Sequence, residues 1–440
     1  MSTFGGINTA LRGLEAHQAA LDTTAHNISN IDTEGYSRQR VNLGASAPLT
    51  VPGGRQGGAG SQVGQGVDVL SYQRLRDDFL DLQYRAQNMT SGQADTAAQR
   101  LGVIQDQLGS DSPNDLGAQL DDYWSSWQTL AANPESSDAK AGVVGAAQGL
   151  ASRFASLDQD LATAGAQATA GVDGLLSDQG PIKPIADELA KLNTSINNAL
   201  GAGQQPNDLL DRRDQLLDQL SNYGQVSVTQ DPTLDASGNP AYPGMVQVSF
   251  GGAATPLVSQ TTVTMPTTAT LSATPGGQIG GLQDVAAKTQ AYRATLNSIA
   301  AAVMSTTNST SSTPIFTGTG ASDMAVIATS ATVTAGAAGG AAADNSAALA
   351  LAGQRGGAVD TGYSGLVGTI GADVANAENA SATSGSVLNS LESRRLSVSG
   401  VSMDDEMADL VRFQRGYQAA AKALSTMDSM LDTLINSTGL

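Results

Sequence analysis

Large apolar residues recur at a fixed interval near the start of the chain. The residues spaced by seven positions are Ile7, Leu14, Leu21 and Ile28, and Leu11 lies four positions after the first of them. A strict seven-residue repeat is typical of a coiled-coil seam, whereas an ordinary core helix has a broader apolar stripe. We therefore predict a coiled-coil helix over residues 3–30.

The end of the chain has the same repeat. Residues 403–436 carry large side chains at every seventh position, and a second set lies three positions later. The two sets comprise Met403, Leu410, Tyr417, Leu424 and Leu431, and Phe413, Met427 and Leu434, with Met407 in the first turn. We expect the two terminal helices to pair as a coiled coil, and to be disordered or labile until they pack on each other or on neighbouring subunits.

Between the terminal helices, residues 76–223 show helical apolar spacing interrupted by turn signals. Two clear stripes are Leu116, Leu120, Trp124, Trp127 and Leu130, and Ile185, Leu189, Leu192, Ile196 and Leu200. Helical spacing returns at residues 282–303 and again at residues 370–391. We predict a helical body domain built from residues 70–224, 280–304 and 360–394.

Short alternating segments rich in valine predict a small β module over residues 225–279. Residues 305–359 are poor in large apolar side chains and rich in Thr, Ala and Gly, so they form either a second short-stranded patch or a variable loop. We assign both segments to an outer insert. The glycine-rich residues 53–66 lack the Gly-Lys-Ser/Thr ending of a phosphate-binding loop and indicate a flexible linker.

The predicted fold is mainly α with a smaller β insert. The chain is long enough for more than one domain, since it has 440 residues. Residues 1–45 and 395–440 form the terminal coiled-coil domain, followed by a helical-bundle middle domain and a short-stranded β module. Aromatic residues make up only 4% of the chain, which favours an elongated, multi-domain shape over one large core.

Charge and cysteine content narrow the possible partners and locations. The net charge is −19, from 22 Lys and Arg against 41 Asp and Glu, so the surface repels nucleic-acid phosphates. The chain has no cysteine and therefore no disulfide. We also expect no cleaved signal peptide and no membrane insertion, because neither a basic start with an apolar run nor a long apolar span occurs.

The residues that enzymes use are scarce. His17 and His26 are the two histidines of the chain, and their spacing of nine does not place them on one helix face as a metal pair. Carboxylate pairs such as Asp404 and Asp405 lie in predicted first turns, where acids favour the helix dipole. We therefore predict that the protein is not an enzyme and has no catalytic residue, metal site or cofactor.

A distinctive segment follows the first helix. Residues 25–39 read Ala-His-Asn-Ile-Ser-Asn-Ile-Asp-Thr-Glu-Gly-Tyr-Ser-Arg-Gln. Locally this pattern predicts a helix end, a turn at a glycine that can adopt a positive φ angle, and an extended continuation. Its candidate assembly residues are Asn27, Asn30, Gly35, Tyr36 and Arg38.

This segment closely resembles the N-terminal signature of the flagellar rod, hook and hook-associated proteins, and its Tyr-Ser-Arg-Gln ending is similar to the hook-associated members. The C-terminal residues 399–407, 413–420 and 430–436 resemble the terminal helix of the same family. Weaker similarity occurs at residues 207–216 and 316–320. Gly416 departs from the family pattern, in which a helix-forming residue is usual, and glycine there costs about 1 kcal/mol.

The resemblance implies a secreted structural subunit that leaves the cell by flagellar type III export. It would self-assemble as a ring at the junction between hook and filament. The implied partners are further copies of the chain, the hook protein, a second junction protein and an export chaperone that covers the C-terminal helix. Ile7, Leu11, Leu14, Leu21 and Ile28 would pair with Leu410, Tyr417, Leu424 and Leu431.

Two alternative functions remain open from the sequence. A hook or distal-rod subunit would have the same terminal helices, although Tyr-Ser-Arg-Gln and the long helical region at residues 76–223 disfavour it. A secreted adhesin or hydrolase carried on flagellar-type termini would need residues 225–357 to supply its activity. That stretch has no histidine and no cluster of acids.

Overall fold

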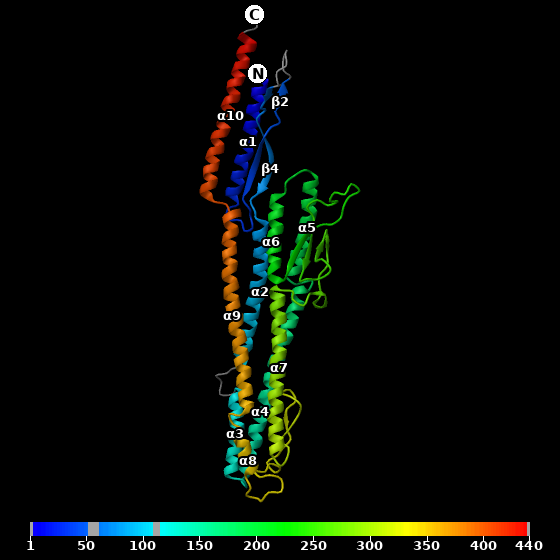
Figure 1. Cartoon of the computed structure of the whole chain (residues 1–440), viewed down its shortest axis with the longest axis vertical. Coiled ribbons are helices and arrows are strands. Elements are labelled where there is room, and N and C mark those ends of the chain that lie inside the picture. The colour runs from blue at the N-terminus through cyan, green and yellow to red at the C-terminus, as the bar shows by residue number, and fades with distance from the viewer. Residues whose placement is uncertain (1–2, 52–60, 109–114, 438–440) are drawn as a thin grey trace.

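The molecule is long and narrow, and both ends of the chain lie at the same tip (Figure 1). The computed structural model describes residues 3–51, 61–108 and 115–437. It is mainly α-helical with small antiparallel sheets, which confirms the predicted fold class. None of the described helices is both long and apolar enough to cross a membrane.

The tip is built from two antiparallel helices and a β-hairpin. Helix α1 (Thr3–Ser29) packs along α10 (Met403–Ser437), as predicted for the coiled coil. Strands β1 (Gln39–Ala45) and β4 (Val67–Arg74) pair with each other and contact α1, and β2 (Leu49–Val51) pairs with β3 (Ser61–Val63). The sequence pattern did not predict these strands, and β3 lies within the expected linker of residues 53–66, whose residues 53–60 lie outside the described residues.

Long helices form the body below this tip. They are α2 (Asp78–Leu108), α3 (Leu116–Ala132), α4 (Ser137–Leu176), α5 (Ile182–Gly201), α6 (Asn207–Tyr223), α7 (Gly277–Thr310) and α9 (Ala358–Ser399). Helix α2 packs against α9, α7 and α6, and α4 packs against α7 and α3. Tyr123, Trp124, Trp127 and Phe154 are fully buried, so both tryptophans of the chain lie in the core where α3 meets α4.

The two segments assigned to an outer insert contact different helices. Strands β5 (Val226–Gln230), β6 (Val246–Phe250), β7 (Val258–Ser259) and β8 (Thr262–Val263) form one antiparallel sheet that contacts α5 and α6, and the 3₁₀ helix η1 (Thr268–Thr270) follows it. Strands β9 (Phe316–Thr317) and β10 (Ala325–Val326) and helix α8 (Ser346–Ala352) contact α3, α4 and α7 instead. The division of the chain into domains stays a prediction.

Candidate functional site

Helices α1 and α10 approach each other most closely at small residues. A Cβ atom added to Gly6 would lie 2.9 Å from Met427, one added to Gly13 would lie 3.9 Å from Ala420, and one added to Gly416 would lie 2.5 Å from the His17 ring. From one contact to the next, the residue number on α1 rises by seven and then by four, and the residue number on α10 falls by the same amounts. The contacts therefore define one antiparallel register over the whole pair.

The seam between the two helices differs from the predicted one by one position on α1. Its buried residues are Ala10, Ala16, Ala20, Thr23, Thr24 and Asn27. The predicted seam residues Ile7, Leu14, Leu21 and Ile28 are only half-buried, and Leu11 is 42% exposed. The contacts at Gly6 and Gly13 lie one position before Ile7 and Leu14, because close helix approach requires small residues, and the pairing of the larger residues stays a prediction.

On α10 the predicted residues show a range of exposure. Leu410, Phe413, Tyr417, Leu424, Met427 and Leu431 are half-buried. Met403 is 43% and Met407 is 49% exposed, although both were predicted at the interface. The side chain of Leu434 lies outside the described residues. A partly exposed apolar surface therefore flanks the seam.

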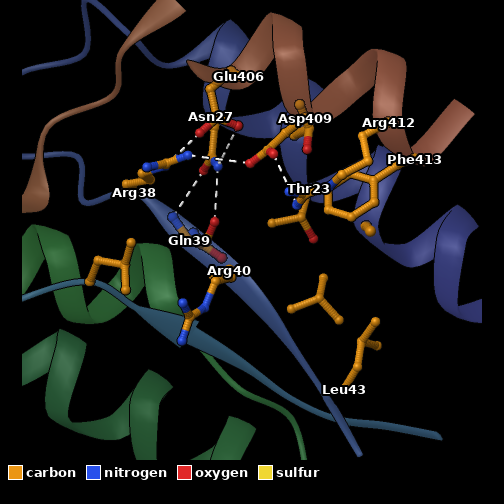
Figure 2. A pocket seen from close by; sticks show the side chains of 14 residues that line it. Thr23, Asn27, Arg38, Gln39, Arg40, Leu43, Glu406, Asp409, Arg412 and Phe413 are labelled. Carbon is orange, nitrogen blue, oxygen red and sulfur yellow. Dashed lines mark hydrogen bonds and ion pairs between the residues drawn. The ribbon is translucent and has the colours of Figure 1, made fainter. Parts of the chain in front are cut away.

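Asn27 fixes the return of the chain at the lower end of this helix pair (Figure 2). Its side-chain amide donates to the Gln39 carbonyl at 2.9 Å and to the Glu406 carboxylate at 3.1 Å. Its side-chain oxygen accepts from the Gln39 amide at 3.0 Å and from the Tyr36 hydroxyl at 2.8 Å. One buried side chain thus joins α1, β1 and α10, and all of its hydrogen-bonding capacity is used.

Arg38 adds a charged contact beside Asn27. Its guanidinium donates to Glu406 at 2.6 Å, and Glu406 is only 1% exposed. The Arg38 backbone amide also donates to the Ser399 carbonyl at 2.8 Å. The signature segment therefore holds the first turn of α10 and the end of α9 together.

The other signature residues have different roles. Asn30 caps the end of α1, since its amide donates to the His26 carbonyl at 3.0 Å. Gly35 adopts a φ angle of 81° and packs against Gln215 of α6, where a Cβ atom would be 3.2 Å away. The Ser37 amide donates to Asp211 of α6 at 2.9 Å. The signature segment thus contacts α6 of the body as well as the terminal helices.

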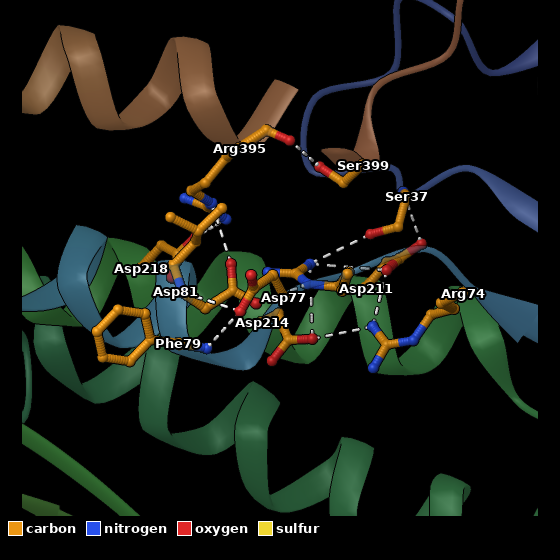
Figure 3. Close-up of polar contacts among 12 residues, drawn as sticks. Ser37, Arg74, Asp77, Phe79, Asp81, Asp211, Asp214, Asp218, Arg395 and Ser399 are labelled. Atoms are coloured by element: carbon orange, nitrogen blue, oxygen red, sulfur yellow. Dashed lines mark hydrogen bonds and ion pairs between the residues drawn. The ribbon is translucent and has the colours of Figure 1, made fainter. Parts of the chain in front are cut away.

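An Arg–Asp cluster joins the tip to the body (Figure 3). It comprises Arg74 of β4, Arg76 just before α2, Asp81 and Arg85 near the start of α2, Asp211, Asp214 and Asp218 on α6, and Arg395 on α9. The shortest contacts include Arg74 to Asp211 at 2.8 Å, Arg85 to Asp218 at 2.7 Å and Arg395 to Asp218 at 2.7 Å. The sequence pattern did not predict this cluster, although the three aspartates follow helical spacing on one face of α6.

Electrostatic effects in the cluster favour the charged forms. Burial alone would raise the pKa of Asp214, but the charges of Arg76, Arg74 and Arg85 hold it below its usual value. Burial would lower the pKa of Arg76, yet its hydrogen bond to Asp81 and the nearby acids raise it.

Tyr36 lies near the same acids. Burial, followed by the charges of Asp208, Asp211 and Glu406, raises the pKa of Tyr36, so the phenol stays a neutral donor to Asn27.

A cavity of about 410 Å³ lies beside these contacts, between α1, β1 and α10. Its lining includes Thr23, Arg38, Arg40, Asp409 and Arg412. His17 lies against Phe413 and Gly416 in the helix pair, while His26 lies 3.3 Å from Asp208. Over residues 3–51, 61–108 and 115–437, no group of three or more His, Asp or Glu side chains is arranged to hold a metal ion.

Comparison with known proteins gives a consistent result along the chain. A family model described as the flagellar hook-associated protein FlgK helical domain matches residues 101–321. A model of the flagellar basal body rod FlgEFG protein C-terminal region matches residues 392–437, and one of the flagella basal body rod protein matches residues 7–36. The matched regions include both terminal helices and most of the body.

Individual relatives carry similar names. The chain is 29% identical to flagellar hook-associated protein 1 of Bacillus subtilis, over 100% of this chain and 99% of that protein. It is 38% identical to flagellar hook-associated protein 1 of Salmonella typhimurium and 37% identical to that of Escherichia coli, over 51% of this chain and 39% of each relative. A solved structure, the flagellar hook junction protein FlgK from Burkholderia pseudomallei, covers 52% of this chain and is itself covered to 43%, at 20% identity and a TM-score of 0.39.

Proposed function

Because the chain belongs to the FlgK family of flagellar hook-associated proteins, we propose that it forms the junction between the hook and the filament of a bacterial flagellum. It is a structural subunit of the extracellular flagellum. The terminal helices assemble with neighbouring subunits, and the body domains lie outside them. The relatives of the chain are structural flagellar proteins, and we propose that this chain likewise catalyses no reaction.

The observation that carries this proposal is the geometry of the tip. Both terminal helices lie together at one end of a long molecule, and the Arg–Asp cluster connects β4 of this tip to the body. A tip of this kind can pack among copies of itself while the body stays outside. A firm connection between tip and body suits a part that transmits torque from one segment to the next.

We assign the assembly surface to the partly exposed apolar residues of the terminal helices. They are Ile7, Leu11, Leu14, Leu21 and Ile28 on α1, and Met403, Met407, Leu410, Phe413, Tyr417, Leu424, Met427 and Leu431 on α10. We add Leu434 from the same repeat of the sequence, although its side chain lies outside the described residues. Exposed apolar surface along a heptad repeat supports contacts with further helices. Asn27, Asn30, Gly35, Tyr36 and Arg38 support this surface by fixing how the chain leaves α1.

Assembly with other flagellar components follows from the family. More specifically, we propose the hook protein below the ring and a second junction protein above it as neighbours. An export chaperone would cover α10 before assembly, because its exposed methionines would otherwise aggregate. Deleting residues 403–440 should abolish chaperone capture in a pull-down, and unchanged capture would reject the chaperone proposal.

Of the alternative functions, a hook or distal-rod subunit is disfavoured by the match to the hook-associated helical domain. No observation favours a secreted adhesin or hydrolase.

Microscopy of a strain that lacks the gene tests the junction proposal. We expect hooks without filaments and filament protein released into the medium, because nothing would join the two parts. Reintroducing the unaltered gene should restore attached filaments. Normal filaments in the deletion strain would show that the junction proposal is wrong.

A further inference from the structure

Helices α1 and α10 each carry an exposed row on the side that faces away from the other helix. The row on α1 is Leu11, Glu15, Gln18 and Asp22, and the row on α10 is Val411, Arg415, Gln418 and Lys422. Leu11 is 42% and Val411 is 41% exposed. Both rows advance by four, three and four residues, which is the spacing of one helix face.

These rows take no part in the contact between α1 and α10 within one chain. A helix turns by about 100° per residue, so Glu15 and Asp22 lie roughly opposite Gly13 and Ala20 on the helix circumference. The same argument places Lys422 away from Gly416 and Ala420. The intramolecular seam is therefore complete without either row.

The rows have opposite charges at equal intervals. Glu15 and Asp22 are seven residues apart on α1, and Arg415 and Lys422 are seven residues apart on α10. Within the described residues, none of these four side chains forms an ion pair. The two basic groups on α10 therefore have the same spacing as the two acidic groups on α1, and all four are exposed.

We propose that the acidic row on α1 of one copy binds the basic row on α10 of the next copy. This inference rests on the proposed assembly and names the helix faces that make it. If the assembly axis runs along the helices, α1 of one copy lies antiparallel to α10 of its neighbour, as it does to its own α10. The contact is heterologous, so it can be repeated from copy to copy around the axis.

One axial displacement aligns both charged pairs. Within a chain, Gly13 is level with Ala420 and His17 is level with Gly416. Shifting the neighbouring copy by four residues, about 6 Å at 1.5 Å per residue, places Glu15 opposite Lys422 and Asp22 opposite Arg415. A single shift satisfies two independent pairs, and it predicts that successive copies are staggered along the axis.

A second copy fits these rows better than an unrelated partner. The rows lie on the outer sides of the α1–α10 pair, so a neighbouring helix pair would continue the same side-by-side packing. Their equal seven-residue intervals also match each other, as expected when both halves of an interface come from one sequence. Other flagellar proteins are the alternative partners for these rows, and cysteine cross-linking distinguishes them from a second copy by mass.

Cysteine cross-linking tests the contact directly, because the chain has no cysteine of its own. The variant carrying Glu15→Cys and Lys422→Cys is produced in the strain that lacks the gene, and isolated flagella are oxidised. We expect a ladder of covalent dimers, trimers and larger species of this chain. The matched control carries Glu15→Cys and Asp404→Cys, both exposed on the same helices, and should give no ladder.

Two results would contradict the proposal: an equal ladder in the control, or attached filaments without any ladder in the test variant. Cross-links to a protein of another mass would assign the rows to a different partner and would likewise overturn it. Because the cysteine variant removes one acid and one base, it keeps the net charge and the Asp22–Arg415 pair, so this result stands even if charge-reversed variants assemble poorly.

Charge reversal provides the second arm. Glu15→Lys with Asp22→Lys should cause loss of attached filaments, as should Arg415→Glu with Lys422→Glu, whereas all four changes together should restore them. The control Glu135→Lys with Asp178→Lys changes the net charge equally at exposed positions of the body and should retain filaments.

The two proposals fail in different ways. If the unaltered gene restores filaments and the reversed variants restore them equally well, the proposed contact is wrong and the junction function stands. If deleting the gene leaves filaments attached, the junction function itself is wrong. Thermal unfolding of the purified variants, followed by circular dichroism, separates lost assembly from lost folding.

Discussion

A single glycine determines how closely α1 and α10 approach at the middle of the pair. Glycine in a helix interior costs about 1 kcal/mol relative to alanine, so Gly416 needs a structural reason. The His17 ring supplies it, because a Cβ atom at position 416 would lie 2.5 Å from that ring. The large His17 side chain opposite position 416 thus explains why a glycine replaces the helix-forming residue that is usual in the family.

We predict that Gly416→Ala destabilises the helix pair by about 1–3 kcal/mol through overpacking, despite the better helix propensity of alanine. Adding His17→Ala should remove most of that cost, which a double-mutant cycle in urea unfolding would measure. Gly102→Ala is the matched control, since nothing lies within 4 Å of its Cβ position, and it should stabilise. Equal effects at both glycines would refute the packing explanation.

Glu406 is the second residue on which the tip depends. It is 1% exposed and accepts from both Arg38 and Asn27. Glu406→Ala should lower the free energy of unfolding of the tip by about 3 kcal/mol, since it leaves buried donors unpaired. Hydrogen exchange of α1 amides would detect this loss. Asp405→Ala, at the exposed neighbouring position, should have little effect, and a similar loss there would contradict the argument.

At the scale of elements, the connection between tip and body uses ion pairs from four different elements. Strand β4, the start of α2, α6 and the end of α9 each contribute charged side chains. Replacing one partner of such a cluster leaves the others uncompensated, so its strength depends on every member being charged.

The Arg–Asp cluster should make the free energy of unfolding decrease as the pH falls. The folded pKa of Asp214 is depressed, so its contribution is complete above the unfolded value, about 3.9, and is lost as pH falls through the folded pKa. We expect urea unfolding to show Asp214→Asn destabilised by about 3 kcal/mol at neutral pH. The difference from the unaltered chain should shrink in acid, because Asp214 then becomes protonated.

The matched control for this prediction is Asp178→Asn, at an exposed position after α4. It should follow the unaltered chain at every pH. A constant difference between Asp214→Asn and the unaltered chain from neutral to acidic pH would show that the charge of Asp214 is not the cause.

At the scale of the whole molecule, the tip and the body have different kinds of core. The body buries large side chains such as Trp124, Trp127 and Phe154, whereas the buried surface of α1 consists of small residues. Burial of apolar area is the main source of folding free energy, so the body should fold without the tip. The tip should depend on both of its helices.

A chain that lacks residues 403–440 should therefore keep a folded body and lose the structure of α1. Hydrogen exchange should show protected amides in α2–α9 and rapid exchange in α1, because α1 has lost its partner helix. Retained protection across residues 3–29 would show that the β-hairpin alone suffices to order α1.

The sequence by itself determined which segments are helical, that the termini form a matched pair, and which family the signature residues resemble. These properties depend on the spacing of residues close together in the chain and on short motifs, both of which can be recognised in the sequence. Strands β1–β4 were missed because the first three are short or interrupted by glycine, so their alternation of apolar and polar positions is weak.

Only the tertiary structure decided which face of α1 meets α10. A seven-residue repeat identifies a face but not its partner, and here small residues take the inner face while the larger ones flank it. The Arg–Asp cluster was equally beyond sequence reasoning, because the hydrogen bond from Arg74 to Asp211 spans 137 positions of the chain. Charged side chains that far apart in sequence become one site only when folding brings their helices and strand together.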